Sequence, residues 1–216
     1  MRIHATGLLF DNDGTLVSSL DSVVRTWTRW AGEYGVTAED FARVGLHGRP
    51  AAEIVADLLP AEQVPAALDR VAALELADVA EGGVEALPGA TRLLRGLPSH
   101  AWAVVTSATR ALATARLRRV GIAPLVLVAA DDITRGKPDP EPYLLGAARL
   151  GRAPSQCVVF EDAPAGLEAG RAAGMWTVGL ATTHPAEELV ADLVVPSLSA
   201  ISAQVTADGW EISAVV

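Results

Sequence analysis

The chain has 216 residues, half of them hydrophobic, which is enough for one large or two small domains with a buried core. Lys and Arg number 17 against 26 Asp and Glu, and the formal net charge of -9 argues against nucleic acid or an anionic membrane as partner. With a single cysteine, no intrachain disulfide is possible. No segment resembles a signal peptide or a membrane span, so we expect a soluble, cytoplasmic protein.

The first predicted element is a buried strand at residues 7–10, and it leads directly into Asp11-Asn12-Asp13-Gly14-Thr15. Two carboxylates therefore stand at the carboxyl end of a strand, the edge where open α/β sheets bind ligands. Gly14 allows the chain to turn sharply away. Because neighbouring carboxylates repel, they need a cation or a shared proton, which favours a metal-assisted reaction. A polar turn that merely closes the strand is the alternative.

Residues 18–82 show helical patterning and no clear strand. Apolar residues recur near helical spacing between Val23 and Tyr34, and residues 51–59 and 66–79 also look helical. We therefore expect an all-helical cap domain over residues 18–82, inserted after the first strand. In that position it is well placed to form a lid over a site at the sheet edge.

From about residue 90, apolar strand candidates alternate with helical stretches, which implies a parallel sheet with helices on both faces. The expected fold is α/β, a doubly wound, Rossmann-like core made of residues 1–17 and 83–216. Residues 1–16 should supply one of its strands. The other strand candidates are residues 101–105, 125–129, 157–160, 177–180 and 193–195, with helices at 110–120, 140–150 and 165–173.

Polar groups follow several of these strand candidates. Thr106-Ser107 comes after the strand at 101–105, Glu161-Asp162 after the strand at 157–160, and Lys137 lies in a loop rich in proline. Singly, each has an ordinary explanation: a helix cap, charges that begin a helix, or a solvated lysine. Together, at one edge of one parallel sheet, they predict a functional site.

This ordered set resembles the four motifs of the haloacid dehalogenase superfamily of phosphatases, in the subclass with a small helical cap. The resemblance covers nearly the whole chain. Asp11-Asn12-Asp13-Gly14-Thr15-Leu16 is similar to the first motif, and Thr106, Lys137 and Glu161-Asp162 match the others. The segments GKPDPEPY at 136–143 and FEDAPAG at 160–166 resemble the sugar-phosphate and glycerol-phosphate phosphatases within the superfamily.

The resemblance implies a phosphatase that hydrolyses small phosphate monoesters, such as sugar or polyol phosphates, through an aspartyl-phosphate. Asp11 would be the nucleophile, and Asp13 would give a proton to the leaving group and take one from water. Mg²⁺ would be held by Asp11, the main-chain carbonyl of Asp13, and Asp162. Glu161 would orient these ligands from outside.

The resemblance also assigns the groups that hold the phosphate. Thr106 and the main-chain N–H groups of Asn12 and Ser107 would bind its oxygens, and Lys137 would neutralise charge during transfer. The partner is thus a small phosphorylated metabolite, and we expect a monomer or weak homodimer. Asn12 stands where the family usually has an apolar residue, and Ser18-Ser19 replaces a frequent Asp-Ser.

The loop His47-Gly48-Arg49-Pro50 resembles the specificity loop of these caps. Arg49 is expected to meet anionic or hydroxyl groups of the substrate, with His47 as a second substrate-binding candidate. An exposed loop with a solvated arginine is the alternative.

Other functions within and outside the superfamily are less consistent with these residues. Related hexose-phosphate mutases carry a histidine twelve residues after the nucleophile, where this chain has Val23. Asp13 argues against a dehalogenase, and the absence of lysine from residues 18–82 argues against a phosphonate hydrolase. A non-catalytic phosphate-binding or interaction protein remains an alternative, although every motif residue is intact.

Overall fold

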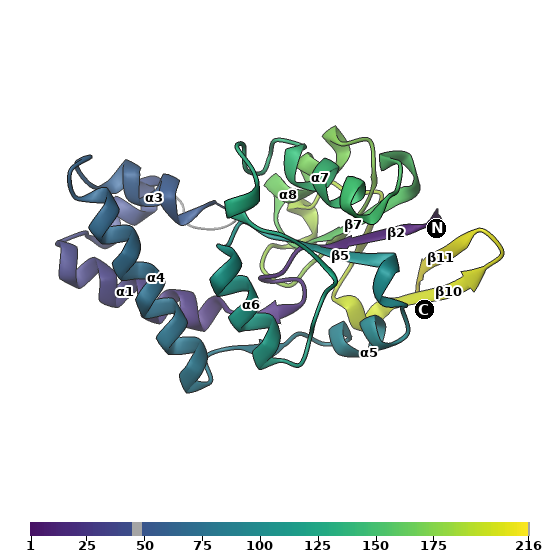
Figure 1. The fold of residues 1–216 in the computed structure, drawn as a ribbon, viewed down its shortest axis with the longest axis horizontal. Coiled ribbons are helices and arrows are strands. Elements are labelled where there is room, and N and C mark those ends of the chain that lie inside the picture. The colour runs from purple at the N-terminus through teal and green to yellow at the C-terminus, as the bar shows by residue number, and fades with distance from the viewer. Residues whose placement is uncertain (45–48, 216) are drawn as a thin grey trace.

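The computed structural model describes residues 1–44 and 49–215, and in this part of the chain six parallel strands form a central sheet (Figure 1). Their order is β6-β5-β2-β7-β8-β9, so the chain order reverses at β2. The carboxyl ends of β2, β5 and β7 therefore meet at the switch point where such sheets bind ligands. The strands are β2 (Gly7–Phe10), β5 (Trp102–Val105), β6 (Val126–Val128), β7 (Cys157–Glu161), β8 (Trp176–Leu180) and β9 (Leu193–Val195).

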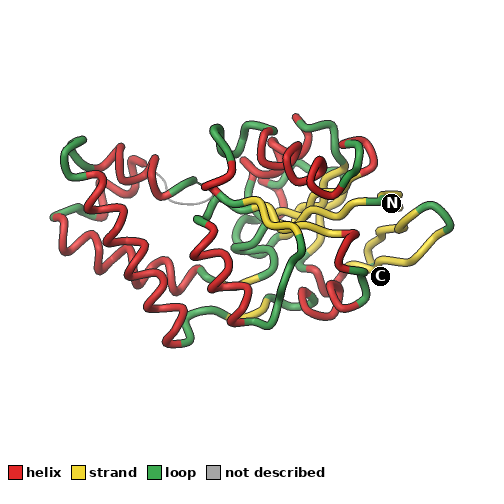
Figure 2. Tube along the Cα trace, viewed as in Figure 1, coloured by secondary structure: helices red, strands yellow, loops and turns green. Residues whose placement is uncertain are grey.

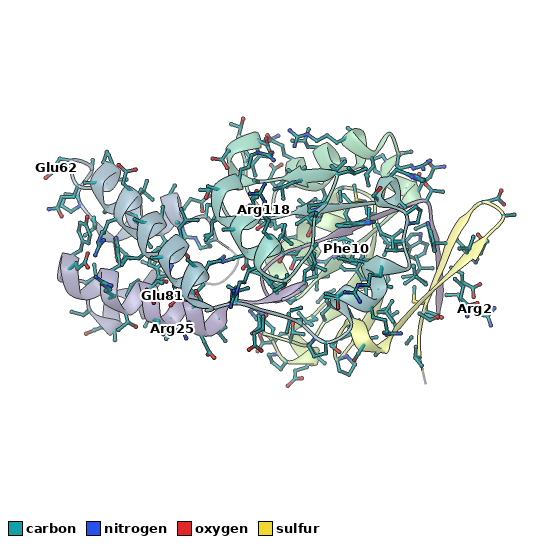
Figure 3. The ribbon with its side chains drawn as sticks, turned by 60° about the horizontal axis from the view of Figure 1, so that its bottom comes forward. Arg2, Phe10, Arg25, Glu62, Glu81 and Arg118 are labelled. Carbon is teal, nitrogen blue, oxygen red and sulfur yellow. The ribbon has the colours of Figure 1, made fainter. Side chains whose placement is uncertain are left out.

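Both faces of this sheet are buried, which explains why its strands read as continuous apolar runs. In β2, Leu8 and Phe10 enter one core cluster and Leu9 enters another on the opposite face. Phe10 lies inside the molecule, whereas Glu62 lies at its far end (Figure 3). The predicted doubly wound core is confirmed. Helices α5 (Ala90–Arg95) and α6 (Arg110–Arg119) cover the first face, and α7 (Glu141–Leu150) and α8 (Pro164–Ala172) cover the second.

Four helices form a separate apolar cluster to one side of the sheet (Figure 2). Two tryptophans lie at its centre, 5.3 Å apart between ring centroids, namely Trp27 and Trp30. The indole of Trp30 donates a hydrogen bond to the carbonyl of Ala67 at 2.9 Å. Assigning residues 18–82 to a cap domain with those limits stays a prediction. These four helices, the helical block, are α1 (Leu20–Tyr34), α2 (Ala38–Val44), α3 (Ala51–Leu58) and α4 (Val64–Glu81).

A short strand pair lies where the chain enters and leaves these helices. Strand β3 (Val17–Ser18) pairs antiparallel with β4 (Glu85–Ala86). Helix α4 also packs along α6 of the core, so the helical block contacts the core through more than the strand pair. Among the described residues, no helix combines the length and the hydrophobicity that crossing a membrane requires.

A second, antiparallel sheet of order β1-β11-β10 lies at the end of the core opposite the helical block (Figure 1). Its strands are β1 (Arg2–Ala5), β10 (Ile201–Thr206) and β11 (Gly209–Ala214). Residues 1–16 supply one strand of the central sheet, as predicted, but the sequence did not reveal β1, which precedes β2 and belongs to this second sheet. Strand β1 alternates exposed and buried residues, a pattern too short to stand out in the sequence. The remaining elements are short 3₁₀ turns at Ser99–Ala101, Ala130–Asp132, Pro154–Gln156, Ala186–Glu188 and Leu198–Ala200.

The packing of α7 on the sheet gives a stability prediction. A Cβ atom at Gly146 would lie 2.7 Å from Cδ2 of Leu9 and 3.0 Å from Cγ2 of Val105. Overpacking costs about 1–3 kcal/mol, which offsets or exceeds the ~1 kcal/mol that alanine gains over glycine in a helix. Gly146→Ala should therefore lower the free energy of unfolding by up to about 2 kcal/mol in denaturant titrations.

The matched control is Gly32 in α1, where a Cβ atom would meet no neighbour within 4 Å among the described residues. Gly32→Ala should raise the free energy of unfolding by about 1 kcal/mol. A stabilising effect of both substitutions would show that α7 does not press on the sheet as described.

Candidate active site

The residues that the sequence singled out come together at the carboxyl edge of the central sheet. Asp11 directly follows β2, and its main-chain N–H donates to the carbonyl of Phe160 in β7 at 2.9 Å. A cavity of about 470 Å³ opens at this edge, between the sheet and helices α1, α3 and α4. Its lining includes Asp11, Asp13, Thr106, Ser107, Lys137, Glu161 and Asp162.

The ammonium group of Lys137 lies at the centre of the site. Its Nζ is 2.6 Å from Oδ1 of Asp11 and 2.6 Å from Oε1 of Glu161. It also donates to the carbonyl of Val105, at the end of β5, at 3.2 Å. One side chain thereby contacts groups from the ends of β2, β5 and β7. Burial opposes its charge, but Asp11 and Glu161 outweigh that effect and raise the pKa of Lys137 well above its usual value.

The site holds more negative than positive charge. Burial, opposed by Lys137 and reinforced by Glu161 and Asp162, raises the pKa of Asp11 well above its ordinary value. Burial and the charge of Glu161 likewise raise the pKa of Asp162 to about 7. Three buried carboxylates thus share one ammonium group, and the excess negative charge calls for a cation or a proton.

Both oxygens of Glu161 are fully engaged. Oε1 accepts hydrogen bonds from Lys137 and from the hydroxyl of Tyr143 at 3.1 Å, and Oε2 accepts from the main-chain N–H groups of Asp162 and Ala163 at 2.9 Å each. A carboxylate with four donors is suited to hold its neighbours in place rather than to bind a ligand itself.

Asp162 is held by hydroxyl groups on two sides. Thr15 donates to its Oδ1 at 3.1 Å, and Thr183 donates to its Oδ2. Gly14 has a φ of +85°, and a Cβ atom there would lie 2.1 Å from Oδ2 of Asp162. The glycine of the first motif is therefore required both by its backbone conformation and by the close approach of Asp162.

The donor set fits a hard divalent cation. Carboxylate oxygens of Asp11, Glu161 and Asp162 lie within 4.8 Å of one another, and all three residues are buried. Because Glu161 is occupied by its own donors, Asp11 and Asp162 are the carboxylates left to bind an ion. Oxygen ligands with surplus negative charge are what Mg²⁺ prefers.

Asp13 is linked to two residues whose importance the sequence analysis missed, directly to Arg116 and through Arg116 to Glu75. Ser19 Oγ and Arg116 Nη1 both donate to Oδ1 of Asp13, at 2.6 and 2.8 Å, and Asn12 Nδ2 lies 3.1 Å from Oδ2. Arg116 Nη2 lies 3.2 Å from Oε1 of Glu75 in α4. A signal did exist: Arg116 and Glu75 each fall on the buried stripe of their helix.

Two residues, Arg49 and His47, are predicted to contact the substrate from the side of the helical block. Arg49 lines the cavity, but its guanidinium donates to Asp57 at 2.8 Å and to the carbonyl of Val44 at 3.0 Å, with Glu53 at 3.5 Å. His47 lies outside the described residues. The role of both residues stays a prediction.

The chain is similar in sequence and structure to known hydrolases. Residues 5–174 match the family model described as haloacid dehalogenase-like hydrolase. Hexitol phosphatase A of Escherichia coli (strain K12) is 40% identical over 212 residues, covering 93% of this chain and 94% of the relative. Validoxylamine A 7'-phosphate phosphatase of Streptomyces hygroscopicus subsp. limoneus is 40% identical over 201 residues, covering 89% and 94%. A hydrolase structure from Pseudomonas syringae superposes with a TM-score of 0.80 at 26% identity, covering 90% and 94%.

The four donors on Glu161 give a stability prediction. In Glu161→Gln, an amide NH₂ would face hydrogen-bond donors whichever way it turned, and Lys137 would lose one of its two carboxylate partners. Breaking a buried ion pair from one side costs about 3–5 kcal/mol of unfolding free energy. Denaturant titration of the purified variant would measure this loss.

Tyr143→Phe serves as the comparison, because it removes a single hydrogen bond to the same carboxylate. It should cost less, about 1.5–3 kcal/mol. An equal or smaller loss for Glu161→Gln would show that Lys137 does not depend on Glu161.

Proposed function

Because the chain belongs to the haloacid dehalogenase-like hydrolases and is a phosphoric monoester hydrolase, we propose that its substrates are small sugar or polyol phosphates. The observation that carries this proposal is the near-full-length match to hexitol phosphatase A, combined with an intact carboxylate–lysine site. In this proposal residues 1–17 and 83–216 form the core and residues 18–82 the cap.

The chemistry proposed for the site has two halves. In the first, a carboxylate oxygen of Asp11 bonds to phosphorus while the bond from phosphorus to the ester oxygen breaks, and Asp13 gives its proton to the departing alkoxide. In the second, Asp13 takes a proton from a water molecule whose oxygen attacks phosphorus, which releases phosphate and restores Asp11. The contact of Lys137 with Asp11 supports the role of Asp11, because the ammonium group favours the ionised, nucleophilic carboxylate.

The transferring group would be held by charge and by hydrogen-bond donors. Thr106 and the main-chain N–H groups of Asn12 and Ser107 are proposed to bind phosphate oxygens, with Lys137 offsetting their charge. Mg²⁺ would be held by Asp11, Asp162 and the main-chain carbonyl of Asp13, with Glu161 fixing their surroundings. When bound, the ion would supply positive charge beside the phosphoryl oxygens.

The part of the substrate beyond the phosphate would face the helical block. A substrate hydroxyl or anionic group would compete with Asp57 for the guanidinium of Arg49, and His47 is proposed to lie in the same specificity loop on sequence grounds. The partner is thus a small phosphorylated metabolite rather than nucleic acid or membrane. A cytoplasmic location and a monomeric or weakly dimeric state belong to the same proposal, and the free, buried Cys157 is consistent with a reducing compartment.

Phosphate release from a panel of esters tests the proposed function. We expect the wild type to hydrolyse hexitol phosphates or glycerol phosphates with added Mg²⁺ and to lose activity in a chelator. Asp11→Asn should reduce turnover by at least about a thousandfold, because an amide is a very poor nucleophile. Circular dichroism would check that the variant is folded. Substantial activity of Asp11→Asn, or a wild type indifferent to Mg²⁺, would contradict the proposal.

A further inference from the structure

A chain of three charged side chains runs from the helical block to the proposed proton carrier. Glu75 on α4 contacts Arg116 on α6 at 3.2 Å, and Arg116 contacts Asp13 at 2.8 Å. The Arg116 side chain is 4% exposed and that of Glu75 is 9% exposed. All three residues line the same cavity, and α4 lies alongside α6 (Figure 1).

Stability alone does not account for this arrangement. A buried guanidinium forfeits its hydration, and buried ion pairs are often no more stabilising than apolar side chains of similar size. Here the loss of hydration is only partly offset, because Nε of Arg116 is buried and has no hydrogen-bond partner among the described residues. A charge held at this cost beside the reacting groups suggests a role in the reaction.

We propose that Arg116 is a positioning residue for Asp13, and that Glu75 fixes where Arg116 lies. This inference rests on the proposed function, in which Asp13 protonates the leaving oxygen. Arg116 and Ser19 both donate to Oδ1 of Asp13, so that oxygen is committed to holding the carboxylate in place. Oδ2, which Asn12 contacts at 3.1 Å, is then the oxygen that exchanges the proton with substrate or water.

The chain also connects two parts of the molecule. Asp13 belongs to the loop after β2, whereas Glu75 belongs to α4 of the helical block. The orientation of the Asp13 carboxylate therefore depends on how α4 lies against α6. Proton transfer requires hydrogen-bond reach between heavy atoms, so a small displacement of Asp13 has a large effect on rate.

The leaving group separates a positioning role from a structural one. An alkoxide leaves only with a proton, so hydrolysis of a hexitol phosphate or glycerol phosphate needs Asp13 in place. The nitrophenolate of p-nitrophenyl phosphate is a stable anion that leaves without one. Because kcat/KM reports the steps up to departure of the leaving group in a two-step transfer, the ratio of kcat/KM for the two esters measures the positioning of Asp13.

The experiment compares Arg116→Gln, Glu75→Gln and the double variant on both esters, with Mg²⁺ present. For the polyol phosphate, kcat/KM should fall by about 10- to 100-fold in each, the scale of a misplaced catalytic group. For p-nitrophenyl phosphate it should fall by less than about threefold. The double variant removes the charges of both Arg116 and Glu75, so neither is left as an unpaired buried charge. Its kcat/KM should fall no further than that of Arg116→Gln, because both residues act through one link.

Arg25→Gln is the matched control. Arg25 forms a bidentate pair with Asp78 between α1 and α4, near the end of α4 (Figure 3), and is not among the residues that line the cavity. It should change neither ester's kcat/KM by more than about twofold, on the scale of an exposed pair. Thermal unfolding of every variant would confirm that each is folded at the assay temperature.

If kcat/KM fell equally with both esters, Arg116 and Glu75 would act on the phosphoryl group or on the fold, and the inference would be overturned. An unchanged kcat/KM with both esters would overturn it as well. The proposed function fails separately, if the wild type releases no phosphate from any hydroxylated ester. An active wild type whose variants keep the same ratio of the two kcat/KM values refutes the positioning role alone.

Discussion

The contact of Lys137 with Asp11 and Glu161 is the interaction on which the site depends. Three strands end within reach of one ammonium group, which contacts Asp11 after β2, the carbonyl of Val105 in β5, and Glu161 in β7. Without that charge, the carboxylates would repel one another at the point where the strand order reverses. The sheet brings the acids together, and Lys137 allows them to stay there.

The charge that Lys137 leaves unbalanced is equally important. Asp162 has a pKa raised to about 7, and its oxygens are held by Thr15 and Thr183. A cation bound between Asp11 and Asp162 would remove the penalty of keeping both ionised, so the proposed Mg²⁺ site would follow from the same packing that brings these carboxylates together. At Asp13, on the side that faces the helical block, the positive charge comes from Arg116.

Much of this could be read from the sequence, for physical reasons. Strand β2 matches its predicted range, because buried parallel strands are continuous apolar runs. The core site residues lie together because parallel strands place their carboxyl ends at one edge. The resemblance to haloacid dehalogenase phosphatases is confirmed by the family match and the phosphatase relatives.

The remaining features depend on tertiary contacts. Arg116 lies among other arginines in Arg116-Leu117-Arg118-Arg119, and only its place on the buried stripe of α6 distinguishes it. Glu75 likewise gains its partner only when α4 packs on α6. The direction of the Arg49 side chain is set by Asp57 within the helical block, which no local pattern reveals.

In the proposed mechanism, Asp11 carries the phosphoryl group during turnover. Rapid quenching of the wild type with a hydrolysable polyol phosphate and Mg²⁺, followed by borohydride, would reduce an acyl phosphate to an alcohol. Peptide mass spectrometry then locates the reduced residue. We expect a hydroxymethyl group in place of the Asp11 carboxyl, only when substrate is present. Reduction at Asp13, or at no acidic residue while phosphate is released, would contradict it.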